Sequence, residues 1–458
     1  MPMPDRPAPP PGPGSARLTR FEKVGLALFT LLVVGFGAVT VVRSALLHDR
    51  HTDFNVYAHA GWAVWNGADV YRVATHANTH FIYPSAFAVA MVPFADPPVG
   101  AAPVGYFFPF AVSVALWFLL SVGFAAATVH LFAAAVLPDA ARGSRRWWYA
   151  RTVPFYACIG GIGFTLGRGQ VNLLVVVLIA AMFAAAVRGR RVRAGAWLAA
   201  AVVVKIIPAF LFLFPAVRRD WRAGVGVAAG LVVGLVAIPV ALWGPAETVA
   251  QHVYVVRHVL LAGATGGDDQ PLAKELTHTT ATSSQSFQSA LHHLQYIDRP
   301  HRLRPAQASR EIRVIHWAAA VFVTLATAWV GWRRVGGGAA DPLVYLGCLC
   351  TAMMLVTPVS HMHYYAFVLP LASGLWLRSM AGRPGAVAGD RRTALVLSAW
   401  GVAVAVPLFP WEFFARLRDG GFGTLATTGL WAFGLWTIAR RPVAVAAEPA
   451  ATPLRTAA

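Results

Sequence analysis

The sequence has few charged residues. Asp, Glu, Lys and Arg make up 12% of its 458 residues, whereas a soluble globular domain carries about 25%. That is too little polar surface to cover a water-soluble body of this length, so a soluble fold is excluded. Hydrophobic residues make up 57% of the chain instead. They recur in apolar runs of about 20 residues, the length that a bilayer core requires of a helix.

Acidic residues are scarce as well, with 19 Asp and Glu against 38 Lys and Arg, which gives a formal net charge of +19. The basic residues do not form one patch or stripe, and this distribution argues against a nucleic-acid partner. They stand in short clusters between apolar runs, as in the cytoplasmic loops of membrane proteins. The charge pattern therefore predicts a multi-pass membrane protein and sets the side of each loop.

Cysteine is rare, and all three cysteines, Cys158, Cys348 and Cys350, fall inside apolar runs. Their spacing fits neither a disulfide framework nor a zinc site. The chain also lacks a DxD-type acidic metal motif and a nucleotide-sugar motif. We therefore expect no metal and no cofactor.

With every arginine cluster placed in the cytoplasm, the chain predicts an all-α integral membrane fold of about twelve transmembrane helices, with both termini inside. We expect a disordered N-terminus over 1–22, a membrane domain over 23–440 and a disordered tail over 441–458. Long extracytoplasmic loops are expected at about 48–104 and 244–312.

Particular spans follow from the same pattern. Residues 24–47 predict a retained first span and 107–137 a long span, whereas 83–94 predict a shorter surface or re-entrant piece. Two hairpins are expected to turn near 167–172 and 205–208, where Gly or Pro interrupts the helix beside an ionisable residue. Such breaks are tolerated at membrane depth only where they line a cavity. Aromatic and His residues over 283–294 predict a packed helix within the second long loop.

Polar residues gather on the expected outer side of the membrane. They are Asp53 after the first span, Arg168, Gln170 and Asn172 in the first hairpin, Lys205 in the second, and His361 and His363 in the segment SHMHYY. Ionisable residues at membrane depth are costly, so we treat them as site candidates. Plainer alternatives stay open: Asp53 as a helix N-cap, Arg168 and Lys205 as interfacial anchors, and the His pair as metal ligands or ordinary interfacial residues.

These residue types fit one kind of chemistry. A carboxylate beside the membrane can take a proton from a hydroxyl, and Arg, Lys and His can hold a lipid-linked phosphate and stabilise its charge as it leaves. The aromatic side chains of Tyr57, Tyr71, Tyr83 and Tyr364 can pack on a sugar ring or a polyprenyl tail. The set suits sugar transfer from a lipid phosphate to a hydroxyl, and equally a site that only binds such a lipid.

The sequence resembles a known family in several motifs. Asp53, followed by YAHAGWAVWNGADVY and FIYPSAFAVAMVPFAD, is similar to the D…Y…G…Y…YPP…P pattern of membrane glycosyltransferases with the GT-C fold. GRGQVNLLVVVL, VVVKIIPAFLFLFPAVRRDW and SHMHYYAFVLP extend the resemblance to glycosyltransferase family 87, the polyprenyl-phosphate-mannose-dependent mannosyltransferases. It covers about 25–435. One departure is that the usual YPP reads Tyr83-Pro84-Ser85.

The resemblance implies roles for individual residues. Asp53 would be the general base in a direct displacement that inverts a β-linked lipid donor to an α-linked product. Gln170, Asn172 and Lys205 would line the donor cavity, and His361 and His363 would contact the donor phosphate. The implied partners are the bilayer, a polyprenyl-phosphate sugar and a glycolipid or glycan acceptor of the cell envelope. The implied location is the plasma membrane, with the site facing the extracytoplasmic side.

Two other functions fit the same residues. A transporter or flippase for a lipid-linked sugar would also have broken hairpins near the midplane, although the sequence has no detectable internal repeat. A non-catalytic subunit of an envelope assembly would not need Asp53. The three hypotheses therefore differ most sharply at Asp53.

Overall fold

The computed structural model describes residues 16–46, 53–75, 79–98, 100–102, 105–261, 284–299, 303–334, 338–383, 386–405 and 411–440. The tail predicted for 441–458 and residues 1–15 of the predicted N-terminal segment lie outside these ranges. Within them nearly all regular structure is helical, and the only β pairings are isolated bridges. The predicted all-α class is confirmed.

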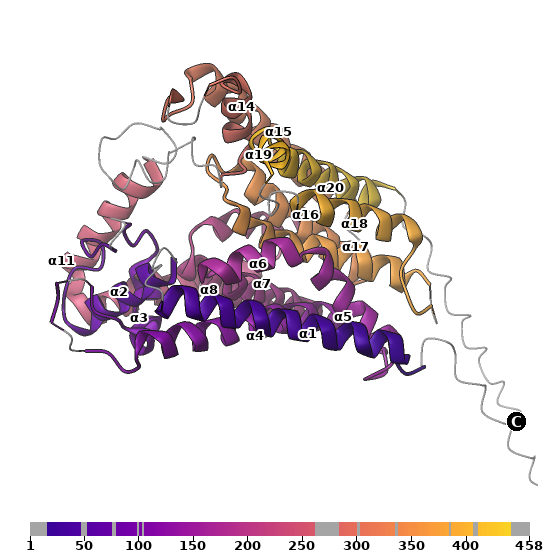
Figure 1. Cartoon of the computed structure of the whole chain (residues 1–458), viewed down its shortest axis with the longest axis horizontal. Helices are drawn as coiled ribbons and strands as arrows, with labels where there is room; N and C mark the ends of the chain where they lie inside the picture. Colours follow the sequence, from indigo (N-terminus) through magenta and orange to yellow (C-terminus); the bar gives the residue numbers. More distant parts are fainter. Residues whose placement is uncertain are drawn as a thin grey trace, which may run out of the picture.

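The N-terminal half forms an elongated layer of helices, and its last helix rises out of the layer at one end (Figure 1). Its helices are α1 (Arg20–Val41), α2 (Asp53–Trp65), α3 (Ser85–Ala90), α4 (Phe110–Val136), α5 (Arg145–Ala157), α6 (Ile159–Arg168), α7 (Asn172–Val187), α8 (Arg191–Val204), α9 (Leu213–Val217), α10 (Trp221–Leu231) and α11 (Ile238–Val255). Short π- or 3-10-helical pieces join them, namely η2 (Val42–Leu46), η3 (Val92–Phe94), η4 (Ile207–Phe212), η5 (Val232–Ala237) and η6 (Val256–Leu261).

The C-terminal half packs on top of this layer (Figure 1). It consists of α14 (Phe287–Gln295), α15 (Arg310–Arg334), α16 (Ala340–Val356), the 3-10 piece η8 (Met362–Val368), α17 (Leu369–Ala381), α18 (Arg391–Ala405), α19 (Glu412–Asp419) and α20 (Phe422–Ala439). α16 and α17 lie at the centre, since every residue of α16 from Pro342 to Leu355 is buried.

Four helical segments in the described ranges are long and apolar enough to cross a membrane: Arg20–Ala45, Phe110–Val136, Trp221–Leu261 and Arg310–Arg333. The predicted spans at 24–47 and 107–137 correspond to the first two. Shorter apolar helices are Asn172–Val187, Ile207–Val217 and Ala340–Val356. The apolar spans confirm a membrane protein, whereas the count of about twelve stays a prediction.

Close packing of small residues joins α8 to α10. A Cβ atom on Gly195 would overlap the carbonyl of Ala223, and one on Gly226 would overlap the carbonyl of Val192. Small residues let the backbones of membrane helices approach this closely. The pair holds α8, and therefore the residues that follow it, against the rest of the layer.

The predicted helix breaks are present. α6 ends at Arg168 and α7 begins at Asn172, while α8 ends at Val204 and is followed by the 3-10 piece η4. The region predicted as a short piece holds only the six-residue α3 and η3. The helix predicted in the second long loop is α14, which buries His292 and His293. The stretch predicted as the second long loop, 244–312, begins inside α11, where Gly244 kinks the helix with a φ of 79°.

Candidate active site

The break between α6 and α7 positions the centre of the site. Gly169 ends α6 in the left-handed conformation, with a φ of 65°, which favours glycine because it has no Cβ atom. Its carbonyl accepts a 2.8 Å hydrogen bond from the indole nitrogen of Trp117 on α4. A Cβ atom here would lie 2.7 Å from the Cβ of Phe54, so the turn fits directly against the start of α2.

This turn directs Gln170 towards Asp53. The Gln170 Nε2 atom donates to Oδ2 of Asp53 at 2.6 Å, and its Oε1 accepts from the Tyr57 hydroxyl at 3.0 Å. A carboxylate can only accept hydrogen bonds, so the amide must face it with its nitrogen. The Tyr57 hydroxyl also lies 3.0 Å from the hydroxyl of Tyr83. Gln170 therefore fixes the orientation of the Asp53 carboxylate and is itself fixed from behind.

Asp53 is the first described residue of α2, and its side chain is 26% exposed. The Arg168 Nη1 atom lies 3.8 Å from Oδ1 of Asp53, and the Arg168 side chain is 48% exposed. Burial raises the pKa of Asp53, while the Arg168 charge, the Gln170 hydrogen bond and the Lys205 charge each lower it. The Asp53 carboxylate accepts from Gln170, which lies in the turn between α6 and α7, and the N-cap alternative does not explain this contact.

Lys205 stands beside this group at the end of α8. It is buried, and its Nζ donates to Oδ1 of Asn172 at 2.9 Å. The same ammonium lies 4.4 Å from the centre of the Tyr364 ring and 5.5 Å from that of Tyr83, in cation–π geometry. Lys205 is therefore not an anchor extending to the interface: it is held inside the protein by an amide and two aromatic rings.

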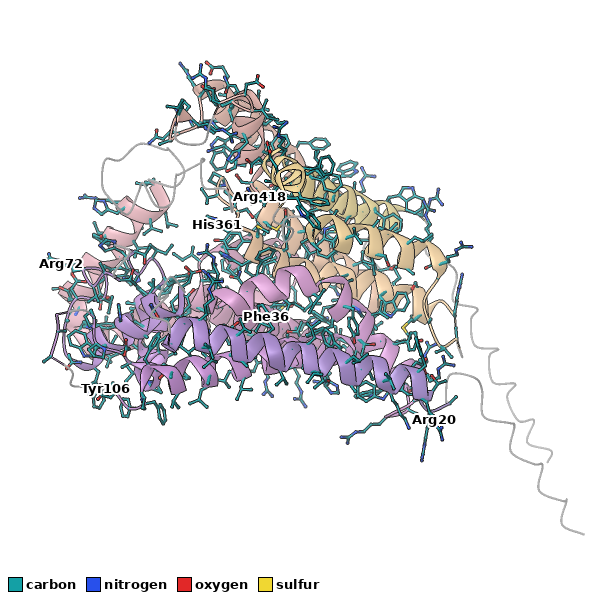
Figure 2. All side chains as sticks on the ribbon, viewed as in Figure 1. Arg20, Phe36, Arg72, Tyr106, His361 and Arg418 are labelled. Atoms are coloured by element: carbon teal, nitrogen blue, oxygen red, sulfur yellow. The ribbon has the colours of Figure 1, made fainter. Side chains whose placement is uncertain are left out.

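The SHMHYY segment is tied to the first hairpin through its backbone. The carbonyl of His363 accepts from Asn172 Nδ2 and from the Thr165 hydroxyl, each at 3.0 Å. The rings of His361 and His363 lie 5.4 Å apart, and Tyr364 packs against both. In Figure 2 the His361 label lies above α6, where the two halves of the protein meet.

A segment from the second predicted loop covers this meeting point. Ser284 forms an isolated antiparallel bridge with His361, and the backbone N–H of Gln285 donates to the carbonyl of Ser360. Thr424 of α20 in turn donates to the carbonyl of Gln285 at 2.6 Å. The second predicted loop thus contributes directly to the surroundings of His361.

All eleven residues predicted for the site are connected. Asp53, Tyr57, Tyr83, Arg168 and Gln170 form one group, and the group of Lys205, Asn172, His361, His363 and Tyr364 joins it through Lys205 and Tyr83. Tyr71 stands behind them, because its hydroxyl donates to the carbonyl of Tyr83 at 3.1 Å and its ring packs on Tyr254.

Sequence reasoning did not identify Trp117 and Thr165, which position the hairpin. A tryptophan or a threonine inside an apolar run carries no local signal of a partner elsewhere in the chain. His59 and Asp96 were also missed as a pair: the His59 Nε2 lies 3.7 Å from Oδ2 of Asp96. That contact joins α2 to the segment after η3 and so supports the position of α2.

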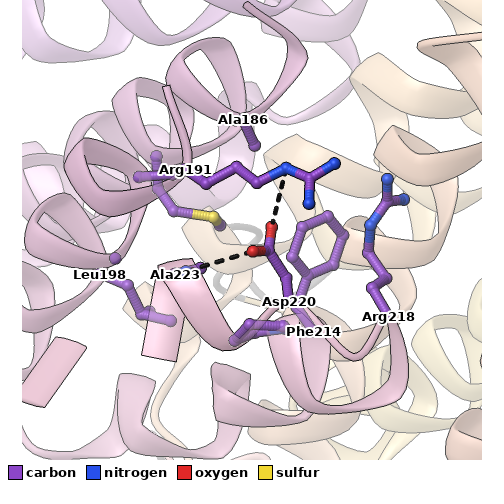
Figure 3. A pocket seen from close by; sticks show the side chains of 11 residues that line it. Ala186, Arg191, Leu198, Phe214, Arg218, Asp220 and Ala223 are labelled. Atoms are coloured by element: carbon purple, nitrogen blue, oxygen red, sulfur yellow. Dashed lines mark hydrogen bonds and ion pairs between the residues drawn. The ribbon is translucent and has the colours of Figure 1, made fainter. Parts of the chain in front are cut away.

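A pocket at the far end of α8 is separate from this site (Figure 3). It is lined by Arg191, Phe214 and Asp220, with 3.8 Å between the Arg191 Nε and Oδ2 of Asp220. Arg191 begins α8 whereas Lys205 follows its end, about 20 Å away at 1.5 Å per residue. We therefore assign it no part in the chemistry around Asp53.

One family model and two known proteins match this sequence. The family model described as glycosyltransferase family 87 matches residues 81–358. The chain is 26% identical over 340 residues to a polyprenol-phosphate-mannose-dependent alpha-(1-2)-phosphatidylinositol mannoside mannosyltransferase of Mycolicibacterium smegmatis, which covers 70% of this chain and 68% of that protein. A Mycobacterium tuberculosis protein of the same description is 24% identical over 345 residues, 74% of this chain and 72% of that protein.

Proposed function

The chain belongs to glycosyltransferase family 87, and from this membership we propose that it transfers mannose from a polyprenyl phosphate to a hydroxyl of a membrane glycolipid. Both relatives carry a name that specifies a polyprenol-phosphate-mannose donor and a phosphatidylinositol mannoside acceptor. The family and the relatives make the chain a membrane glycosyltransferase. The donor, acceptor and residue roles that follow are our proposal.

The observation that carries it is the orientation of Asp53 beside two cations. Its carboxylate is held by Gln170 and lies 3.8 Å from Arg168, with Lys205 held in the same cluster. A base and cations at one place are what displacement of a phosphate by a hydroxyl requires. A site that only binds the lipid has no need of an oriented base.

The reaction we propose is a single displacement. The acceptor oxygen forms a bond to the anomeric carbon while the bond from that carbon to the phosphate oxygen breaks. Asp53 takes the proton of the acceptor hydroxyl, and the electron pair of the broken bond leaves on polyprenyl phosphate. Attack from the face opposite the phosphate inverts the configuration, so a β-linked donor yields an α-linked product.

The cations would hold the donor. Lys205 and Arg168 neutralise charge on the phosphate as it leaves, with His361 and His363 as further contacts. Because the lipid phosphate is already an activated leaving group and side-chain cations stand beside Asp53, we propose that no metal or cofactor takes part. Tyr57, Tyr83 and Tyr364 are assigned to the walls on which the sugar packs, and Tyr71 supports Tyr83.

We further propose that the protein lies in the plasma membrane with Asp53 at the extracytoplasmic surface. The support is the distribution of arginines, which places the basic clusters on the opposite side. The acceptor would then be a glycolipid or glycan of the cell envelope.

The test is transfer by the full-length protein in membranes. Radiolabelled polyprenyl-phosphate mannose is supplied with and without a phosphatidylinositol mannoside, and labelled lipid is separated and treated with an α-mannosidase. We expect label in the acceptor that the α-mannosidase releases. No acceptor-dependent label, together with movement of the labelled donor across the membrane, would contradict transfer and favour the transporter hypothesis.

A further inference from the structure

An apolar groove runs between α1, α4 and α5, and none of the residues assigned to the candidate active site lines it. Its volume is about 890 Å³, and its walls are almost entirely aliphatic and aromatic, with Val33 and Val34 from α1 and Leu119 and Val122 from α4. That volume is in the range of sites that take a small ligand. We call it the apolar groove.

A second hollow lies beside one end of the groove and is basic. Its volume is about 430 Å³, and Arg17, Lys23 and Arg142 line it without any acidic residue. Leu26 and Trp148 line both hollows, so the two are adjacent. Among the described residues, none of the three cations forms an ion pair with a carboxylate. We call this the basic pocket.

Arg151 lies in the groove near this end. It is buried, its guanidinium stacks 4.0 Å from the centre of the Trp147 ring, and it donates to His130 Nδ1 at 3.2 Å and to the Trp147 carbonyl at 2.8 Å. In the described part of the chain no carboxylate pairs with it. A buried charge is costly unless an opposite charge accompanies it. The end of the groove beside the basic pocket therefore favours an anion.

The neighbouring acidic residue is already engaged. Glu22 accepts from Arg145 at 2.6 Å and from the Tyr149 hydroxyl at 2.8 Å, which ties α1 to α5. It also forms the capping box of α1 with Thr19. The basic pocket therefore keeps its positive charge.

The basic pocket and Asp53 lie at opposite ends of the long helices α1 and α4. Lys23 stands at the start of α1 and Val41 at its end, about 27 Å apart at 1.5 Å per residue. Asp53 lies near the start of α4, because the ring centre of the next residue, Phe54, is 6.1 Å from that of Phe110, the first residue of α4. Arg142 follows the end of α4. In Figure 2, Arg20 and Tyr106 mark the two opposite ends. A donor phosphate beside Asp53 cannot reach the basic pocket.

We propose that the apolar groove and the basic pocket together bind one anionic phospholipid of the membrane leaflet opposite Asp53. Its phosphate lies among Arg17, Lys23 and Arg142, and its acyl chains follow α1 towards Val41. Charge complementarity and the adjacency of the two hollows select this occupant, because a zwitterionic lipid would leave the three cations without net compensation. The lipid would fasten α1, which otherwise buries little of its surface, against α4 and α5.

The first test needs no substitution. The purified protein is reconstituted in phosphatidylcholine vesicles that contain a trace of photoreactive phosphatidylglycerol, illuminated and mapped by peptide mass spectrometry. We expect cross-links within Arg20–Val41, Phe110–Val136 and Arg145–Ala157, the three helices that line the groove, and little labelling from photoreactive phosphatidylcholine at equal concentration. Cross-links elsewhere, or equal labelling by the two lipids, would overturn the proposal.

The second test removes the cations. The double variant Lys23→Gln/Arg142→Gln is compared with Arg193→Gln, which alters an exposed arginine of α8 outside the pocket, and lipid that copurifies from mixed phosphatidylglycerol and phosphatidylcholine vesicles is counted by native mass spectrometry. We expect about fivefold less phosphatidylglycerol for each cation removed, and no change in Arg193→Gln. Unchanged retention in the double variant contradicts the proposal.

Two controls separate this site from other interpretations. Glycerol phosphate added at millimolar concentration should not displace the lipid, since it lacks the chains that fill the groove, and displacement would show a site for a free phosphate instead. Asp53→Asn should retain phosphatidylglycerol like the wild type, because the proposal does not depend on mannose transfer. Loss of the lipid in that variant would contradict two separate sites.

Discussion

The Nε2 atom of Gln170 lies 2.6 Å from Oδ2 of Asp53, although 117 positions separate the two residues in the chain. The contact joins the start of α2 to the break between α6 and α7. It gives the proposed base one orientation before any substrate binds. A positioned base contributes to catalysis through geometry as much as through its pKa.

Replacing Gln170 tests this positioning role. Gln170→Leu keeps the approximate size but removes the donor to Asp53 and the acceptor for Tyr57. We expect kcat for mannose transfer to fall by about 10- to 100-fold with little change in the KM of the donor. Gln285→Leu, in the segment that covers His361, is the control for a general loss of packing. A change in the KM of the donor without a fall in kcat would contradict the positioning role.

The conformation of Gly169 gives a second prediction. Gly169→Ala forces a side chain into a backbone with a φ of 65° and against the Cβ of Phe54, at a cost of about 1–3 kcal/mol. We expect lower thermal stability and reduced transfer, because α2 must move and carries Asp53 with it. Gly163→Ala is the matched control on the same helix, since nothing lies within 4 Å of its added Cβ. Equal effects of the two variants would contradict this explanation.

The pH dependence of transfer follows from Asp53. The base acts only when ionised, so kcat/KM should fall as the pH drops through its pKa. Burial raises that pKa, and the fall should therefore begin at a higher pH than for an exposed aspartate, whose pKa is about 3.9. Because the Arg168 charge lowers the pKa of Asp53, Arg168→Gln should move the midpoint further upward.

The pH profile of Arg72→Gln provides the comparison. Arg72 pairs with Asp69 at 3.1 Å and is largely exposed, so its loss should leave the midpoint in place. A midpoint that moves downward in Arg168→Gln, or shifts equally in both variants, would show that Asp53 is not the titrating group.

Much of this arrangement could be predicted from residue patterns. The breaks near Gly169 and Lys205, the short piece after Tyr83 and the helix now seen as α14 all carry local signals, namely Gly or Pro in an apolar run or aromatic and His residues in a polar one. These signals depend only on neighbours in the chain. They also brought together the candidate residues, because the loops on one side of a membrane share one surface.

The pairings between those residues could not be predicted. Which amide faces Asp53 depends on the left-handed turn at Gly169, and the bridge from Ser284 to His361 joins segments that no periodicity relates. Lys205 could as well have been an interfacial anchor by sequence alone. The number of spans also remains a prediction, since several buried helices are shorter than a membrane-crossing helix requires.

Asn172 provides a prediction of stability. Its amide accepts from Lys205 and donates to the carbonyl of His363, so Asn172→Ala leaves a buried ammonium without its acceptor. We expect a loss of about 1–3 kcal/mol, measured as a lower Tm in detergent. Asn66→Ala removes a single exposed bond to the Trp62 carbonyl and should change the Tm little. Similar shifts in both variants would mean that the buried pair contributes no special stability.

The central claim is that Asp53 takes the proton of the acceptor hydroxyl, and its most direct test is transfer by Asp53→Asn and Asp53→Ala. Asp69→Asn is the control, because that carboxylate belongs to the same outer segment but pairs with Arg72 and the amide of Tyr71. The purified proteins are compared for kcat with polyprenyl-phosphate mannose and a phosphatidylinositol mannoside. We expect both Asp53 variants to lose about 10²- to 10⁴-fold in kcat while Asp69→Asn stays near the wild type. Wild-type turnover by both Asp53 variants would contradict the account.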